Sequence, residues 1–212
     1  MHPLVVLIVV PALASFIMFH RGVRTNRALA QSISQSLERA FEPTETEYRN
    51  IGGTIGYHFS YLLEGNIRKV QGLFTLLPRQ AMFYLPIARM MGREDELHVS
   101  FYSDHRPMGE GHIVVPSRLR SWWAQIEDQE EFYQEIVERD GYRFAILTHN
   151  RFVRERLTWF LFDLPSVDGL RQFAAFRTDN SYLLVMNPST QNVPHMLNAV
   201  RERLPELRTR FG

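Results

Sequence analysis

The chain contains no cysteine among its 212 residues, so it forms no disulfide bond and offers no thiolate ligand to a metal. It also lacks any Asn-x-Ser/Thr glycosylation acceptor with a non-proline residue in the middle. Both absences suit a protein whose main part faces a reducing cytoplasm. The formal net charge is only +1, so charge gives no sign of a DNA partner.

Motifs for catalysis and cofactor binding are missing as well. Gly52, Gly53 and Gly56 are not followed by the Lys-Ser/Thr of a phosphate-binding loop. No Gly-x-Ser-x-Gly sequence and no internal repeat is present. The sequence therefore predicts no catalytic residue, no cofactor and no enzyme activity.

Three evenly spaced histidines, His98, His105 and His112, raise the question of a metal site. We expect the strands around them to form a hairpin, with His105 at the turn and the other two on separate strands. Three imidazoles placed in this way do not converge on one tetrahedral point, so we predict no metal site.

The first apolar segment runs from Pro3 to Phe19 and would rise roughly 25 Å as a helix. A secretory signal is one interpretation, because Ala12-Leu13-Ala14 before Ser15 is similar to a cleavage site. However, only Met1 and His2 precede the apolar run, and the run continues past that site. We therefore favour a retained transmembrane anchor over residues 1–20.

Arginines follow the apolar segment closely. Arg21, Arg24 and Arg27 are predicted to lie at the membrane interface, and positive flanks stay in the cytoplasm. The expected protein spans the membrane once, with its N-terminus outside or in a lumen and its bulk in the cytoplasm. From residue 21 to residue 43 an amphipathic juxtamembrane helix is expected to continue the anchor and to end at Pro43. Its apolar residues recur every four positions: Leu29, Ile33, Leu37 and Phe41.

Residues 44–212 are rich in core material, since 45% of the whole chain is hydrophobic and 12% aromatic. Paired strand-like runs with interspersed helices predict an α+β fold with a mostly antiparallel sheet. The expected strands form a hairpin over 51–63 and 67–77, a second hairpin over 96–104 and 111–116, and further strands at 142–149, 157–165 and 181–188. The expected helices cover 78–92, 117–137 and 150–156, with a closing helix from Pro194.

The helix expected at 78–92 is rich in methionine and aromatic residues. We favour a buried core helix, and the alternative is a surface that adapts to apolar partners. In that alternative Phe83, Met90 and Met91 are the predicted partner-binding residues. Basic residues from Arg151 to Arg156 and in the closing helix could meet lipid headgroups or RNA phosphates, but neighbouring glutamates favour ordinary surface ion pairs equally.

Several blocks of this sequence, in the same order, resemble the calumin family. The first is "NRALAQSISQSLERAFE", and the longest is "GNIRKVQGLFTLLPRQAMFYLPIARMMGREDELHVSFYSD", whose Ala88–Met91 stretch is the most specific piece. The blocks "LTWFLFD" and "SYLLVMNPSTQNVPHMLNAVRERL" resemble the family's closing strands and helix. The likeness extends in pieces over about residues 26–204, and none of its blocks is a catalytic motif.

The resemblance implies a single-span, translocon-associated protein of an intramembrane chaperone complex. The implied partners are translocon or insertase subunits, a small membrane protein, the lipid bilayer and, more weakly, the ribosome. Two family features are absent from this sequence, the long acidic lumenal segment linked to calcium binding and the long charged C-terminal coiled coil. We therefore expect a minimal relative without calcium binding that assists membrane-protein insertion or folding. The alternative is a membrane-tethered sensor or small-molecule-binding module.

Overall fold

A nine-stranded antiparallel sheet forms the centre of the computed structural model. The structure describes residues 3–123, 132–189 and 191–209, and side chains from residue 9 onward except those of 120–123. The order across the sheet is β1-β2-β3-β4-β9-β8-β5-β7-β6. The strands are β1 (Glu45–Asn50), β2 (Gly56–Leu62), β3 (Ile67–Thr75), β4 (Glu96–Ser103), β5 (Gly111–Val114), β6 (Tyr133–Arg139), β7 (Tyr142–Thr148), β8 (Leu170–Phe176) and β9 (Ser181–Met186). This arrangement confirms the predicted α+β fold with antiparallel strands.

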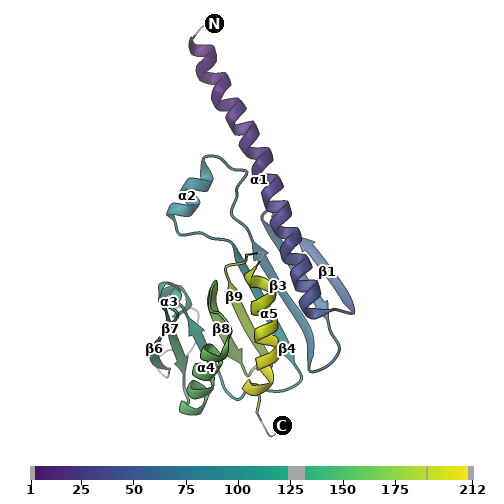
Figure 1. Ribbon diagram of the computed structural model, residues 1–212, viewed down its shortest axis with the longest axis vertical. Coiled ribbons are helices and arrows are strands. Elements are labelled where there is room, and N and C mark those ends of the chain that lie inside the picture. Colours follow the sequence, from purple (N-terminus) through teal and green to yellow (C-terminus); the bar gives the residue numbers. More distant parts are fainter. Residues whose placement is uncertain (1–2, 124–131, 190, 210–212) are drawn as a thin grey trace.

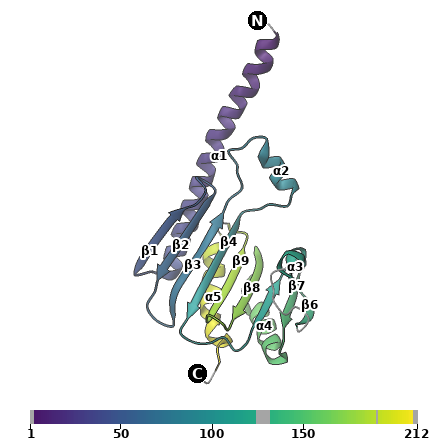
Figure 2. The ribbon, with the colours of Figure 1, turned by 180° about the vertical axis from the view of Figure 1, so that it is seen from behind.

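The longest helices pack on one face of this sheet. The helices are α1 (Pro3–Phe41), α2 (Tyr84–Met90), α3 (Pro116–Trp123), α4 (Arg151–Asp163) and α5 (Asn192–Arg203), which continues into a 3₁₀ turn at Leu204–Leu207. The C-terminal half of α1 lies beside α5 in front of the strands (Figure 1). From behind, the sheet comes forward and both helices lie beyond it (Figure 2). The predicted closing helix is thus confirmed.

Helix α1 is continuous over 39 residues, and only its C-terminal half is packed in the core. Ile33, Leu37 and Phe41 are buried in the core, as the predicted four-residue apolar repeat requires. The helix ends where Glu42 takes a positive φ of 46° ahead of Pro43. In the part of the chain with described side chains, no helix is long and apolar enough to cross a membrane. The anchor expected over residues 1–20 rests in part on residues 1–8, which lie outside that part.

The core lies between the helices and the sheet. The rings of Phe41 on α1 and Phe101 on β4 meet edge to face with centroids 5.7 Å apart. Further along the sheet Phe160 of α4 stacks on Phe173 of β8 at 4.1 Å. These aromatic pairs hold α1 and α4 to the same layer of strands.

The first predicted hairpin is confirmed, because β2 pairs with β3 across the turn at Glu64–Asn66. The second is wrong. Strands β4 and β5 do not pair with each other, since β9 and β8 lie between them in the sheet. The hairpin of β8 and β9 takes these positions by pairing with β4 on one side and β5 on the other.

The correction also changes the reasoning about the histidines. His98 lies on β4 and His112 on β5, with β9 and β8 between them, while His105 follows β4. Among the described residues, no three His, Cys, Asp or Glu side chains are placed to hold a metal ion.

Two further predictions are wrong in the second half of the chain. Residues 157–165 are not a strand, because the single helix α4 runs through Asp163. Its start is capped by Asn150, whose side chain accepts a 2.8 Å hydrogen bond from the Phe152 amide. Its buried residues follow helical spacing: Val153, Leu157, Phe160 and Leu161.

The acidic helix expected over 117–137 is correct only in its first part. Helix α3 ends at Trp123, residues 124–131 lie outside the described residues, and residues 133–139 form β6. Asp140 and Gly141 both have positive φ, 52° and 78°, as a tight hairpin turn requires. Across this turn β6 pairs with β7, so residues 133–137 form a strand although their apolar spacing predicted a helix.

Candidate functional site

The N-terminal half of α1 presents apolar side chains to its surroundings. Its described apolar residues from Val9 onward are largely exposed, including Leu13, Phe16, Ile17 and Phe19. In Figure 1 this half extends away from the sheet and from the rest of the helical layer. An exposed apolar area of this kind usually marks a contact site.

Helix α2 presents a second set of exposed apolar side chains. The exposed fractions are 74% for Phe83, 88% for Met90 and 65% for Met91, whereas Ala88 is the buried residue of the helix. The prediction of a buried core helix over 78–92 is therefore wrong. Only seven residues form the helix, and they lie on an excursion between β3 and β4 outside the sheet.

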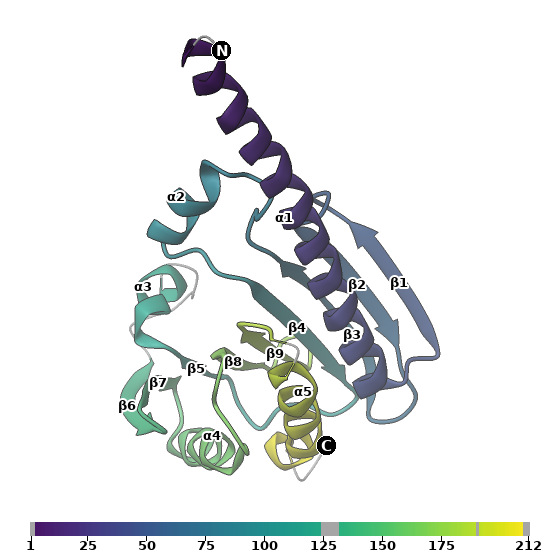
Figure 3. The ribbon, with the colours of Figure 1, turned by 45° about the horizontal axis from the view of Figure 1, so that its top comes forward.

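The two sets lie at the same end of the molecule, as Figure 3 shows. The Ser15 hydroxyl donates a 3.3 Å hydrogen bond to the sulfur of Met82, just before α2. About two turns further along α1, the backbone of Arg79 and Gln80 packs so closely on Gly22 that a Cβ there would collide with it. We call the exposed side chains of residues 9–19 and 83–91 together the apolar surface.

A buried polar cluster fixes this excursion to α1. Asn26 is fully buried on α1 and donates a 2.9 Å hydrogen bond to the Leu77 carbonyl. Its side-chain oxygen accepts from Arg79 at 3.0 Å. Arg79 also forms two hydrogen bonds, of 2.9 and 2.5 Å, to the carboxylate of Asp95. Since Asp95 accepts from the Leu77 amide at 2.7 Å as well, the two ends of the excursion are tied together.

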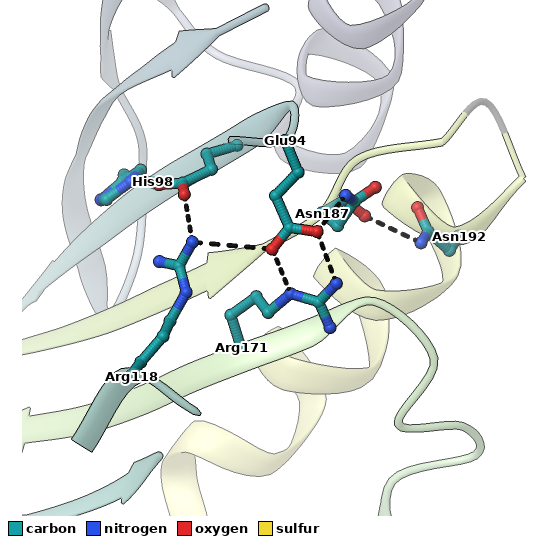
Figure 4. A network of polar contacts seen from close by, with 7 residues as sticks. Glu94, His98, Arg118, Arg171, Asn187 and Asn192 are labelled. Atoms are coloured by element: carbon teal, nitrogen blue, oxygen red, sulfur yellow. Dashed lines mark hydrogen bonds and ion pairs between the residues drawn. The ribbon is translucent and has the colours of Figure 1, made fainter. Parts of the chain in front are cut away.

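A second polar network joins the residue two positions before β4 to the neighbouring strands β8 and β9 (Figure 4). Glu94 accepts hydrogen bonds of 2.6 and 2.7 Å from Arg171 on β8, in a two-point geometry. Asn187, which follows β9, donates to the same carboxylate at 2.9 Å. The side chain of Asn192 on α5 then donates to the Asn187 carbonyl at 3.0 Å. The network thus connects β4, β8, β9 and α5.

Arg118 from α3 joins Glu94 to Glu96, the first residue of β4. Its guanidinium lies 3.6 Å from the Glu94 carboxylate and forms an ion pair with Glu96. Glu96 also meets the His98 ring at 3.0 Å, and this hydrogen bond, helped by Arg118, lowers the Glu96 pKa to about 2. Arg171 lowers the pKa of Glu94 in the same way. Both carboxylates are therefore ionised and paired at neutral pH, and act as supports rather than as proton acceptors.

The three arginines predicted at the membrane interface lie on α1 between the exposed apolar half and the packed half. Arg21, Arg24 and Arg27 are all exposed. The structure brings Phe83, Met90 and Met91 to the same end of the molecule as these arginines (Figure 3). Helix α4, which carries Arg151, Arg154 and Arg156, lies at the other end of the molecule from α2 (Figure 1).

Sequence reasoning missed the residues that position this end of the molecule. Asn26, Arg79 and Asp95 carry no local motif, because Asn26 and Arg79 lie 53 positions apart in the chain. Arg171 and Glu94 are 77 positions apart. One available signal was the acidic run Glu94–Glu96 at the start of a strand, where successive side chains point to opposite faces.

No protein-family model matches this chain, and the search of curated proteins found no match to it. The resemblance to the calumin family therefore stays a prediction based on the sequence blocks, of which Ala88–Met91 lies in α2 and the turn that follows it.

Proposed function

We propose that this protein is a non-enzymatic, membrane-anchored factor that assists the insertion or folding of membrane proteins at a translocon or insertase. The observation that supports this most is the apolar surface, in which Met90 and Phe83 are exposed beside the exposed apolar half of α1. Covering such side chains with a membrane or an apolar partner lowers the free energy of the system. In this proposal residues 1–20 anchor the chain, and the sheet domain stands in the cytoplasm.

The continuity of α1 gives the proposed anchor a mechanical connection to the domain. The same helix that carries Phe16 and Ile17 carries Asn26, Ile33 and Leu37, which are buried in the domain. A small membrane protein or insertase subunit that packs on the exposed half would thus be held at a fixed position relative to the sheet. Such positioning needs no catalytic group.

The proposal is tested by purifying tagged full-length protein in mild detergent or nanodiscs and identifying its partners by mass spectrometry. A version without residues 1–20 is purified in parallel, and Ile136→Asn, on exposed strand β6, serves as the matched surface control. We expect insertase or translocon subunits with the full-length protein and with Ile136→Asn, and their loss with the deletion. The proposal would be contradicted if only lipid were recovered, or if a soluble partner bound the full-length and the truncated protein equally.

A pocket at the other end of α1 favours the second candidate, a membrane-tethered small-molecule-binding module. This pocket has a volume of about 300 Å³ and lies between Phe41, Tyr182, Arg201 and Arg208. Two of its polar groups are already engaged, since Arg201 donates to the Ala40 carbonyl and Tyr182 to that of Leu207. Thermal-shift screening of full-length protein with soluble carboxylates and phosphates, repeated with Arg208→Gln, distinguishes the candidates. Saturable stabilisation that Arg208→Gln removes would favour this module.

A further inference from the structure

Acidic residues are absent from the two segments that build the end of the molecule around the apolar surface. The chain has 23 Asp and Glu residues, yet none lies in residues 1–37 or 65–93. The same two segments contain exposed arginines on α1, on α2 and directly after it: Arg21, Arg24, Arg27, Arg89 and Arg93. The acidic residues that directly follow Arg93 are already paired, Glu94 with Arg171 and Asp95 with Arg79. This end of the molecule is therefore apolar with exposed arginines, and neither segment contains a carboxylate to offset them.

Helix α2 is attached at the level where α1 changes from apolar to basic. The apolar run of α1 ends at Phe19, and its first arginine is Arg21. The loop that leads into α2 contacts α1 at Ser15 and at Gly22, on either side of this change. Figure 3 shows α2 at the same level as this part of α1, with the loop between the two helices. If the apolar run lies in a bilayer, α2 is therefore placed at the boundary between acyl chains and headgroups.

The side chains of α2 fit such a boundary. Phe83, Ile87 and Met90 are apolar and exposed, Tyr84 has an apolar ring with a polar tip, and Arg89 is exposed. Aromatic and arginine side chains of this type place their apolar parts among acyl chains and their polar ends among headgroups. Arginines close to an anionic bilayer are also attracted to it electrostatically.

From these observations we infer that residues 83–93 lie in the interface of an anionic lipid bilayer and form a second membrane attachment beside α1. This inference rests on the proposed membrane anchoring and names the occupant of the α2 part of the apolar surface. Attachment at two points fixes the tilt of the domain relative to the membrane. The polar cluster of Asn26, Arg79 and Asp95 holds the spacing between these points.

The absence of cysteine allows a direct test with single-cysteine variants of the full-length protein. Met90→Cys, Phe16→Cys and the control Ile136→Cys each replace an exposed residue and carry an environment-sensitive fluorophore. The labelled proteins are reconstituted into vesicles of phosphatidylcholine with 30% phosphatidylglycerol, and quenching by nitroxide-labelled lipid is measured. Matching circular dichroism melting curves verify that the labelled variants fold alike.

We expect lipid quenching at positions 16 and 90 to exceed that at position 136 by about threefold or more. Without phosphatidylglycerol, or with Arg89→Gln and Arg93→Gln together, quenching at position 90 falls while that at position 16 stays. If position 90 behaves like position 136 while position 16 is quenched, the interfacial attachment is wrong but the anchor stands. If positions 16 and 90 both behave like position 136, both proposals fail. If the residue at position 90 is shielded from water in native membranes but is not quenched by lipid in the vesicles, a protein covers this surface and the inference is wrong.

Discussion

The two halves of α1 are both rich in apolar residues, yet only one of them is used in folding. In the C-terminal half, Ile33 and Leu37 point into the core while Gln31 and Gln35 stay exposed. In the N-terminal half, Phe16 and Ile17 are adjacent in the chain and both exposed. An apolar stripe on one side of a helix fits a single packing partner, whereas a helix that is apolar all round calls for an apolar environment. The difference separates residues that stabilise the domain from exposed residues, which we have proposed to contact a membrane or partner.

The largest effect is expected from truncating a buried residue of the packed half. Leu37→Ala should lower the free energy of unfolding by about 3 kcal/mol, because it removes contacts in a filled core. Ile17→Ala is the matched change in the exposed half and should cost less than about 0.5 kcal/mol. Urea unfolding of both variants in the same detergent measures the difference. Equal losses would remove the distinction between the two halves.

The next largest effect should come from the cluster that fixes α2 to α1. Asp95→Asn weakens the ion pair with Arg79 and should cost about 2 kcal/mol, since Asp95 is buried. It should also loosen the excursion, so that trypsin cleaves after Arg89 and Arg93 faster than in the unmodified protein. Asp104→Asn, at a solvent-exposed pair with Arg68, is the control and should cost less than about 1 kcal/mol. A cleavage rate unchanged by Asp95→Asn would show that the cluster does not hold α2.

A smaller effect should appear as acid sensitivity of the network on β4. The Glu96 pKa is lowered from 4.5 to about 2 in the folded protein, so its contribution to stability is complete above pH 4.5. That contribution is lost as the pH falls from about 4.5 to about 2, because the unfolded chain takes up the proton first. Glu96→Gln should flatten this part of a plot of unfolding free energy against pH. An unchanged slope in Glu96→Gln would show that Glu96 does not cause this acid sensitivity.

The smallest effect on stability is expected within the apolar surface itself. Met90→Gln should change the free energy of unfolding by less than about 0.5 kcal/mol, because Met90 is almost fully exposed. The same variant should bind more weakly to anionic vesicles in a flotation assay, since it removes apolar contact area. A large loss of stability with unchanged binding would show that Met90 contributes to folding and not to membrane binding.

Much of the fold could be predicted because some segments specify their structure locally. The four-residue repeat of the packed half of α1 and the β2–β3 hairpin with its turn at Glu64–Asn66 are of this kind. The β4–β5 pairing failed because sheet order is decided by long-range contacts, and β8 and β9 lie between these strands. Strand β1 gave no signal, since its six residues are all exposed and mostly polar.

The candidate site was only partly predictable for a related reason. The composition of residues 82–91 indicated an apolar element but not whether it is covered, because burial depends on where the rest of the chain lies. The excursion leaves Phe83 and Met91 exposed because its ends are joined by Arg79 and Asp95, a pairing that no local pattern reveals. The distribution of acidic residues, by contrast, could be read from the sequence alone.

The exposed half of α1 can be examined in native membranes by the reaction of single cysteines with a water-soluble maleimide. Ile17→Cys and Ile136→Cys in the full-length protein replace residues with similar exposed fractions, 50% and 43%. If the exposed half lies in the bilayer, the cysteine at position 17 reacts slowly until detergent is added, while that at position 136 reacts at once. Equal rates before detergent would show that water surrounds this half of α1, and the proposed membrane anchor would be wrong.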